Sequence, residues 1–292
     1  MRHFAVLDAP SILGLRPTGV EYLPLALKAA GLIRELDADY LGAVPPPAYS
    51  AARDEVTQVL NTQAIRDYSI ALADALLPLL TRGRFPLVLG GDCSILLGNM
   101  LALRRLGRYG LFFLDGHADF YQPEASPTGE AADMELAIAS GRGPDILADL
   151  HGLRPLVSDE DIVVFGYRDE DEYLAAGSQD IRTSKMHLFP LVHIREVGVV
   201  AAVEAGLRQL AGQALDGFWI HLDVDVLHDD EMPAVDYRLP GGLRFFELRE
   251  ALRLLHLSGR AVGMDVTIFN PLLDADGRLS FELVRCIAGG LR

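Results

Sequence analysis

The chain has few cysteines and no long apolar run. Its only cysteines are Cys93 and Cys286, which excludes a disulfide framework and fits a reducing compartment. No stretch of about 18 apolar residues occurs, so we expect no membrane-spanning helix and no membrane partner. Residues 1–10 lack a basic segment followed by a long apolar one. We therefore expect no signal peptide and a cytoplasmic protein.

Basic residues are scarce relative to acidic ones. The sequence holds 26 Lys and Arg residues against 41 Asp and Glu residues, a formal charge of −15. Such a chain repels phosphate backbones, so we expect no nucleic-acid partner. An acidic excess favours solubility, and the carboxylates of a cation-binding site would also contribute to such an excess.

Short apolar segments alternate with amphipathic segments along the chain. Strands are expected at residues 4–7, 86–89, 111–114, 162–165, 218–222 and 261–266. Helices are expected at residues 22–36, 64–80, 95–106, 199–210, 246–255 and 281–288. Strands that are apolar on both faces and separated by helices predict a parallel sheet covered on both sides. We expect one α/β domain over residues 1–292, with loops at 43–51, 123–132 and 178–185.

Three segments with polar side chains follow predicted strands, at residues 88–94, 113–119 and 221–227. Because ligands of open parallel sheets bind at the carboxyl ends of the strands, all three segments are expected in one crevice. Asp115, His117 and Asp119 alternate at a spacing of two, and so do Asp223 and Asp225. This spacing puts each set on one side of an extended segment.

Four carboxylates and one imidazole aimed at one place repel one another unless cations lie between them. Mixed carboxylate and imidazole ligands suit Mn²⁺, Fe²⁺ or Zn²⁺ better than Ca²⁺. Five ligands are more than one ion needs, so we expect two ions about 3.5 Å apart that share carboxylates and a bridging hydroxide. A lone Asp-x-Asp is usually a solvated turn. Charged residues directly after buried strands, however, cost free energy unless they are paired or bind a metal ion.

These segments resemble the ureohydrolase family, which includes arginase, agmatinase and formimidoylglutamase. The family's signatures are G-G-D-H-S, D-A-H-x-D and D-x-D-x-x-D-P. The chain has G-G-D-C-S from Gly90, D-G-H-A-D from Asp115 and D-V-D-V-L-H-D from Asp223. The resemblance implies a three-layer α/β/α sandwich around an eight-stranded parallel sheet. It also implies a binuclear Mn²⁺ site, with other divalent transition metals compatible, and it allows a homo-oligomer.

The resemblance implies six metal ligands, which are Cys93, Asp115, His117, Asp119, Asp223 and Asp225. Asp115 and Asp223 would bridge the ions, Cys93 and Asp119 would complete one shell, and the remaining two ligands would complete the other. The bridging hydroxide would attack the trigonal carbon of a guanidine or related group. Asp119 would accept its proton and pass it to the leaving amine, which makes it the catalytic residue.

The chain departs from the family pattern at Cys93, which replaces a histidine ligand. A thiolate is a softer ligand and would change the metal preference. The alternative is a small buried cysteine that leaves its ion with fewer ligands. His221 precedes Asp223 by two residues and would point the same way, so it could support a ligand.

Further departures concern the substrate. Ala132 and Glu130 replace a histidine and an asparagine of the arginase loop, where Thr128 could still offer a hydroxyl group. Ile268 lies where guanidine hydrolases usually have a glutamate, so no carboxylate is available there to bind a guanidinium group. Asp171 is a candidate for binding a substrate amine, although its acidic segment could equally be a solvated loop.

The leading hypothesis is therefore a hydrolase of linear amidine or guanidine C–N bonds in a small-molecule substrate other than plain arginine, such as a hydroxyguanidine. Two alternatives remain open at this point. One is a metal-dependent amide hydrolase similar to the deacetylases. The other is a catalytically impaired binding protein with a ureohydrolase fold, motivated by Cys93, Ala132 and Ile268.

Overall fold

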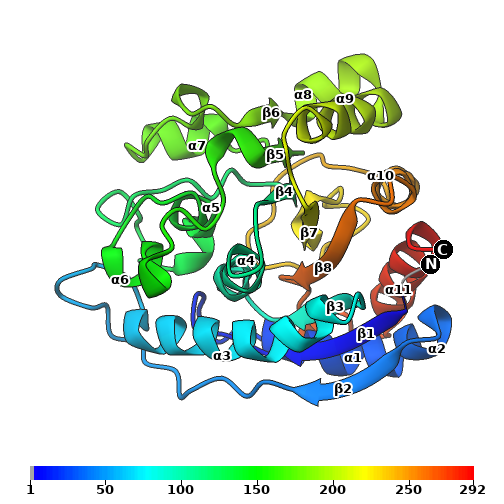
Figure 1. Ribbon diagram of the computed structural model, residues 1–292, viewed down its shortest axis with the longest axis horizontal. Coiled ribbons are helices and arrows are strands. Elements are labelled where there is room, and N and C mark those ends of the chain that lie inside the picture. Colours follow the sequence, from blue (N-terminus) through cyan, green and yellow to red (C-terminus); the bar gives the residue numbers. More distant parts are fainter. Residues whose placement is uncertain (1–2) are drawn as a thin grey trace.

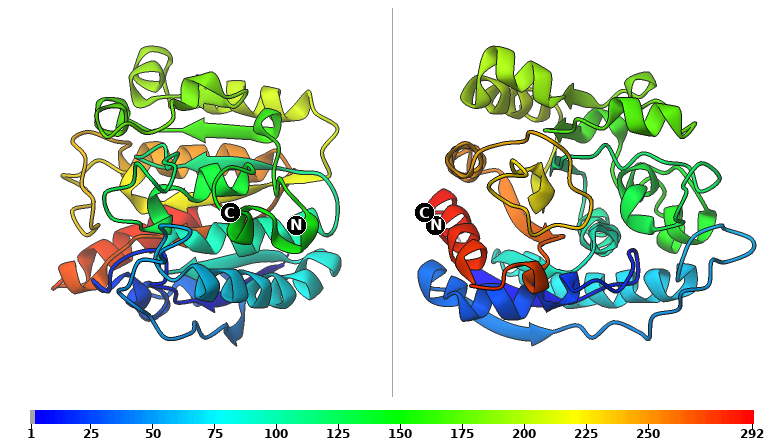
Figure 2. Two further views of the ribbon diagram at one scale, coloured as in Figure 1. Left: turned by 90° about the vertical axis from the view of Figure 1, so that its left-hand side faces the viewer. Right: turned by 180° about the vertical axis from the view of Figure 1, so that it is seen from behind.

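The computed structural model describes residues 3–292 and contains one eight-stranded sheet. All neighbouring strands are parallel, in the order β2-β1-β3-β8-β7-β4-β5-β6. Figure 2 shows them stacked from the blue β2 edge to the green β6 edge. The strands are β1 (Phe4–Ala9), β2 (Asp39–Ala43), β3 (Phe85–Gly90), β4 (Tyr109–Leu114), β5 (Ile162–Phe165), β6 (His187–Phe189), β7 (Gly217–Asp223) and β8 (Ala261–Thr267).

Helices cover both faces of the sheet (Figure 1). One face carries α1 (Leu23–Ala29), α2 (Leu32–Leu36), α8 (Leu191–Val197), α9 (Val199–Ala211), α10 (Phe245–Leu257) and α11 (Arg278–Gly290). The other carries α3 (Thr62–Thr81), α4 (Leu96–Arg104), α5 (Glu135–Ala139), α6 (Asp145–Ala148) and α7 (Glu170–Ala175). The predicted three-layer α/β/α sandwich with a parallel sheet is confirmed.

The two edge strands, β2 and β6, were not predicted from the sequence. Residues of β2 are largely exposed, and β6 is only three residues long. Neither carries the continuous apolar run by which the buried strands are recognised. The helix predicted at residues 22–36 is in fact two helices, because Gly31 adopts a left-handed conformation with φ 99° between them.

Side chains of the central strands alternate between the two helical layers. In β7, Trp219 enters the apolar cluster under α3–α7, whereas Phe218 and Ile220 enter the cluster under α8–α11. His221 and Asp223 follow Trp219 at a spacing of two and so share its side of the sheet. This alternation directs polar groups at the end of β7 toward the layer that contains α4 and α5.

Within residues 3–292, no helix combines the length and apolarity needed to cross a bilayer.

Changing Arg108 to alanine should lower the free energy of unfolding by about 1–3 kcal/mol. Arg108 binds Asp161 through two hydrogen bonds of 2.8 and 2.9 Å. Asp161 is only 1% exposed, so the variant leaves a buried carboxylate without its cation. Urea denaturation measures the change. The control is Arg285→Ala, since Arg285 is 75% exposed beside Glu282 and should contribute less than about 0.5 kcal/mol. Equal effects for the two variants would contradict the assignment.

Candidate metal centre

Four adjacent strands bring the predicted ligands together. Strands β4 and β7 pair up to Leu114 and Leu222, so Asp115 and Asp223 occupy neighbouring strand ends. The loop after β3 brings Cys93 to the same place, where its Sγ donates to Asp223 Oδ2 at 2.9 Å. The convergence follows from the sheet order, because β8 alone separates β3 from β7.

Backbone amides hold the carboxylates of this edge in place. His117 N donates to Asp115 Oδ1 at 2.7 Å, and Asp225 N donates to Asp223 Oδ1 at 2.8 Å. Gly116 N donates to Asp225 Oδ1 at 2.9 Å and so joins the two motifs. Each aspartate thus has one carboxylate oxygen held by a main-chain bond, while its second oxygen faces a side chain (Cys93 for Asp223, His117 for Asp225) or, in Asp115, has no hydrogen-bond partner.

Two groups of potential ligands overlap at this edge. We call the first of them the inner group, because all of its residues are fully buried. It consists of Cys93, Asp115, Glu135 and His221. The outer group consists of Asp115, His117 and Asp225. In each group, one ligand atom per residue lies within 4.8 Å of the others. Asp115 belongs to both groups, the arrangement expected of a residue that bridges two ions.

The other predicted ligands lie next to these groups. Asp119 and Asp223 line the adjacent cavity together with His117 and Asp225. Neither Asp119 nor Asp223 falls within the inner or the outer group. Their roles as ligands, like those of the other predicted ligands, remain proposals.

Glu135 was missed by the motif analysis. It is the first residue of α5, within the segment Glu-Leu-Ala-Ile-Ala, and it is fully buried. A carboxylate in an otherwise apolar segment is costly unless it has a partner. That cost was the signal that could have pointed to it.

The electrostatics of the centre favour bound cations. Burial, followed by repulsion between neighbouring acids, raises the pKa values of five groups well above their ordinary range, and these groups are Cys93, Asp115, Asp119, Glu135 and Asp223. Burial opposes the charge on His117, but Asp225 beside it raises its pKa to about 9. Asp225 behaves in the opposite way, because His117, at 2.8 Å, lowers its pKa despite burial.

Several buried polar atoms also lack a hydrogen-bond partner. They are Asp115 Oδ2, both carboxylate oxygens of Glu135, and His221 Nε2. Buried polar atoms are normally paired, and a divalent ion would satisfy these. The residues present therefore fit the binding of divalent metal ions.

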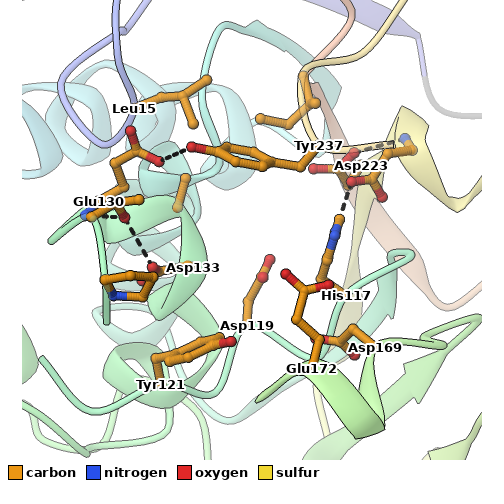
Figure 3. Close-up of a pocket in the computed structure, with 15 residues that line it drawn as sticks. Leu15, His117, Asp119, Tyr121, Glu130, Asp133, Asp169, Glu172, Asp223 and Tyr237 are labelled. Atoms are coloured by element: carbon orange, nitrogen blue, oxygen red, sulfur yellow. Dashed lines mark hydrogen bonds and ion pairs between the residues drawn. The ribbon is translucent and has the colours of Figure 1, made fainter. Parts of the chain in front are cut away.

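A cavity of about 680 Å³, including its open mouth, adjoins the centre (Figure 3). Asp119 and His117 face into it between Tyr121 and Tyr237. The lining includes two of the predicted substrate-binding residues, Thr128 and Glu130.

The third predicted substrate-binding residue, Asp171, is not part of that lining. Its side chain is exposed, and its neighbour Glu172 lines the cavity instead. Successive residues of α7 point about 100° apart, so the two side chains face different directions. Asp171 therefore stays a prediction, and Glu172 is a further candidate because it lines the cavity.

The far wall of the cavity carries a buried carboxylate. Glu130 is 2% exposed and accepts a hydrogen bond of 2.8 Å from the hydroxyl group of Tyr237. Its other oxygen lies 3.2 Å from Nε of Arg16. Thr128 is bound within the same wall, since its hydroxyl group donates to Asp133 at 3.2 Å. Glu130 is thus already neutralised in part by groups of the protein.

Two residues of the lining have unusual backbone conformations. Asp119 has φ 44° and Ile268 has φ 69°. Aspartate tolerates left-handed geometry, but a β-branched isoleucine there is an outlier that the surrounding structure must enforce. The enforcing contacts include the hydrogen bond from Ile268 N to Gly91 O at 2.8 Å.

Comparison with known proteins agrees with this geometry. The family model for the arginase family matches residues 5–289. An arginase of Staphylococcus aureus (strain COL) is 33% identical over 290 residues, covering 97% of this chain and 94% of that protein. The structure of Bacillus caldovelox arginase aligns with a TM-score of 0.90 at 28% identity, over 100% of this chain and 98% of that one.

Formimidoylglutamase of Bacillus subtilis shares the fold, with a TM-score of 0.75 at 18% identity, over 100% of this chain and 86% of that one. The family resemblance inferred from the motifs is therefore confirmed. The chain belongs to the arginase family, whose members are metal-dependent hydrolases of carbon–nitrogen bonds.

Proposed function

We propose that the chain hydrolyses a C–N bond of a linear amidine or guanidine other than plain arginine, such as a hydroxyguanidine. It would do so with two divalent ions, Mn²⁺ in the simplest case. The observation that carries the proposal is the cavity lining, which contains Ile268 as well as Asp119, Asp223 and Asp225. The relatives named arginase support guanidine-type chemistry.

Ile268 disfavours a fully charged guanidinium group at its end of the cavity. A buried guanidinium group requires a bidentate anion, and an isoleucine side chain offers none. A hydroxylated guanidine is less basic and depends less on such an anion. The apolar side chain therefore selects against plain arginine.

The charge of the lining also disfavours an α-carboxylate. Among the described residues that line the cavity, several are acidic and none is Lys or Arg. Arg16, near Glu130, is already paired with that carboxylate and is 64% exposed. An α-carboxylate would therefore meet acidic neighbours without a free cation.

The residues of the chain would divide the chemical work. Bound divalent ions supply Lewis acidity and make water nucleophilic at neutral pH. Asp119 is 6% exposed and faces the cavity, and its pKa is raised by burial and by Glu135. From this position, the carboxylate of Asp119 would accept the proton of the attacking water and donate it to the leaving amine.

The test is a substrate panel with the Mn²⁺-loaded protein. The panel contains arginine, hydroxyarginine, agmatine, guanidinobutyrate and formimidoylglutamate, and the products measured are urea, hydroxyurea and formamide. We expect hydrolysis of at least one member with a kcat/KM above that for arginine. Arginine as the best substrate would overturn the choice of substrate, and no product from any member would overturn the amidine class.

Ile268→Glu should raise kcat/KM for arginine or agmatine by about 10- to 100-fold. A new carboxylate at this position can form charge-assisted hydrogen bonds with a guanidinium group, worth about 1.5–3 kcal/mol. Replacing a β-branched residue at φ 69° also relieves backbone strain. Steady-state kinetics on both substrates measures the effect. The control is Ile268→Gln, because glutamine has the size of glutamate but no charge. An equal gain in kcat/KM in this variant would show that the charge is not the cause.

An amide hydrolase is the second candidate, and Ile268 favours it too. A neutral amide needs no carboxylate in the cavity, so an apolar residue there is compatible with it. Acetylated polyamines and acetyl-lysine peptides, assayed for released acetate, separate the two functions. Acetate release without activity on the amidine panel would select this second candidate.

A further inference from the structure

The inner group contains two residues that lie outside the ligand pattern of the motifs. Glu135 is the first residue of α5, and His221 lies in β7, two residues before Asp223. Both are fully buried. Both also present atoms without hydrogen-bond partners, namely the two oxygens of Glu135 and Nε2 of His221.

The surroundings of His221 determine which ring nitrogen is free. Nδ1 lies 2.5 Å from Asp265 Oδ2, and Asp265 Oδ1 accepts hydrogen bonds from Trp219 Nε1 and Asn99 Nδ2. Asp265 is thus an acceptor on both oxygens, so Nδ1 of His221 carries the proton. The ring is held flat against Phe113, with centroids 4.7 Å apart.

The lone pair of His221 Nε2 is therefore available on the side of Asp115, whose Oδ2 is 3.9 Å away. A histidine that binds a metal through one nitrogen usually donates the other N–H to a carboxylate. The pair of His221 and Asp265 has this arrangement, and it is assembled entirely from buried residues.

Glu135 has no cationic partner among the described residues. The charges of Asp115 and Asp223 oppose the charge on Glu135, and its remaining acidic neighbour, Asp119, approaches within hydrogen-bonding reach. A buried carboxylate surrounded by carboxylates is unfavourable without a cation.

We propose that Glu135 and His221, together with Cys93 and Asp115, bind the inner metal ion. One ligand atom from each of the four residues lies within 4.8 Å of the others. Ligands on opposite sides of a transition-metal ion with bond lengths of about 2.0–2.3 Å stand about 4–4.6 Å apart. Small side-chain adjustments therefore let one ion contact all four.

This ligand set gives the two metal positions different preferences. Thiolate and imidazole are softer ligands than carboxylate, so the inner position favours Zn²⁺, Co²⁺ or Fe²⁺ over Mn²⁺. The outer group shares Asp115 and adds His117 and Asp225, a ligand set that also suits Mn²⁺. The inference rests on the proposed function only in that both need a bound ion.

The test is metal binding by the apo protein without substrate. Titration with Co²⁺ is followed by the near-ultraviolet thiolate-to-cobalt charge-transfer absorption, and elemental analysis after gel filtration counts the ions. We expect this absorption in the parent chain and its loss in Cys93→Ser. We also expect added Zn²⁺ to displace one of two bound Mn²⁺ ions and to leave the other.

Glu135→Gln should weaken Co²⁺ binding at the inner position by at least about tenfold, because even the loss of a group behind a ligand costs about 10- to 100-fold. The control is Glu172→Gln, which neutralises an exposed glutamate in the cavity wall and should leave Co²⁺ binding unchanged. Thermal unfolding of each apo variant checks that it folds. His221→Gln, with the same expected loss, replaces Glu135→Gln if the latter does not fold.

Co²⁺ affinity and absorption unchanged in both Glu135→Gln and His221→Gln would overturn the proposal. Zn²⁺ that displaces neither Mn²⁺ ion, or both equally, would overturn the difference in preference. Failure of the proposed function is separate, since inactivity on every substrate leaves these binding results intact.

Discussion

Replacing Asp115 with alanine should reduce hydrolysis of the best substrate by at least about 1000-fold, because both metal positions lose a ligand at once. Asp115 is the residue common to the inner and outer groups. Its bound metal should fall from two ions to fewer than one per chain. Steady-state kinetics and elemental analysis of the Mn²⁺-loaded variant measure the two effects.

The apo form of Asp115→Ala should still fold. Asp115 is fully buried, and Asp119, Asp223 and Asp225 all repel its charge, so its removal relieves repulsion in the metal-free protein. Asp145→Ala is the matched control, because Asp145 is exposed and absent from the cavity lining. It should change activity by less than about twofold. If Asp115→Ala kept two ions and normal activity, the metal centre would lie elsewhere.

Changing Gly91 to alanine should lower the free energy of unfolding by at least about 3 kcal/mol, which is about 6–12 °C in Tm for a chain of this size. A Cβ atom on Gly91 would lie 1.8 Å from the carbonyl oxygen of Ser11, and backbone cannot rotate away as a side chain can. Gly91 O also accepts the hydrogen bond from Ile268, so the shift would reach the cavity. Thermal and urea denaturation measure the loss.

Gly212→Ala provides the comparison for Gly91→Ala. Gly212 ends α9 with φ −71°, and its Cβ atom would meet nothing closer than 3.4 Å. Alanine is compatible with this conformation, so stability should be unchanged or rise by up to about 1 kcal/mol. Gly91→Ala should also weaken metal binding, since Cys93 follows two residues later. A Gly91→Ala variant as stable as Gly212→Ala would mean that the Ser11 loop moves aside without cost.

Much of the fold and of the candidate centre follows from local sequence patterns. The buried strands β3, β4, β7 and β8 are continuous apolar runs, and each is recognisable without its neighbours. The spacing of two in the aspartate motifs also needs no partner, because it depends only on the alternation of an extended chain. For this reason the sequence by itself determined the parallel sheet, the family and the edge where Asp115 and Asp223 meet.

Only the tertiary structure decided which further residues join them. Glu135 and Asp115 are separated by a long loop, and no local pattern predicts that α5 directs a carboxylate beneath the end of β4. The free nitrogen of His221 depends in the same way on Asp265 of the neighbouring strand. Contacts between distant segments arise when strands pair and helices dock, so the composition of the inner group and the place of Glu172 in the cavity lining required the folded chain.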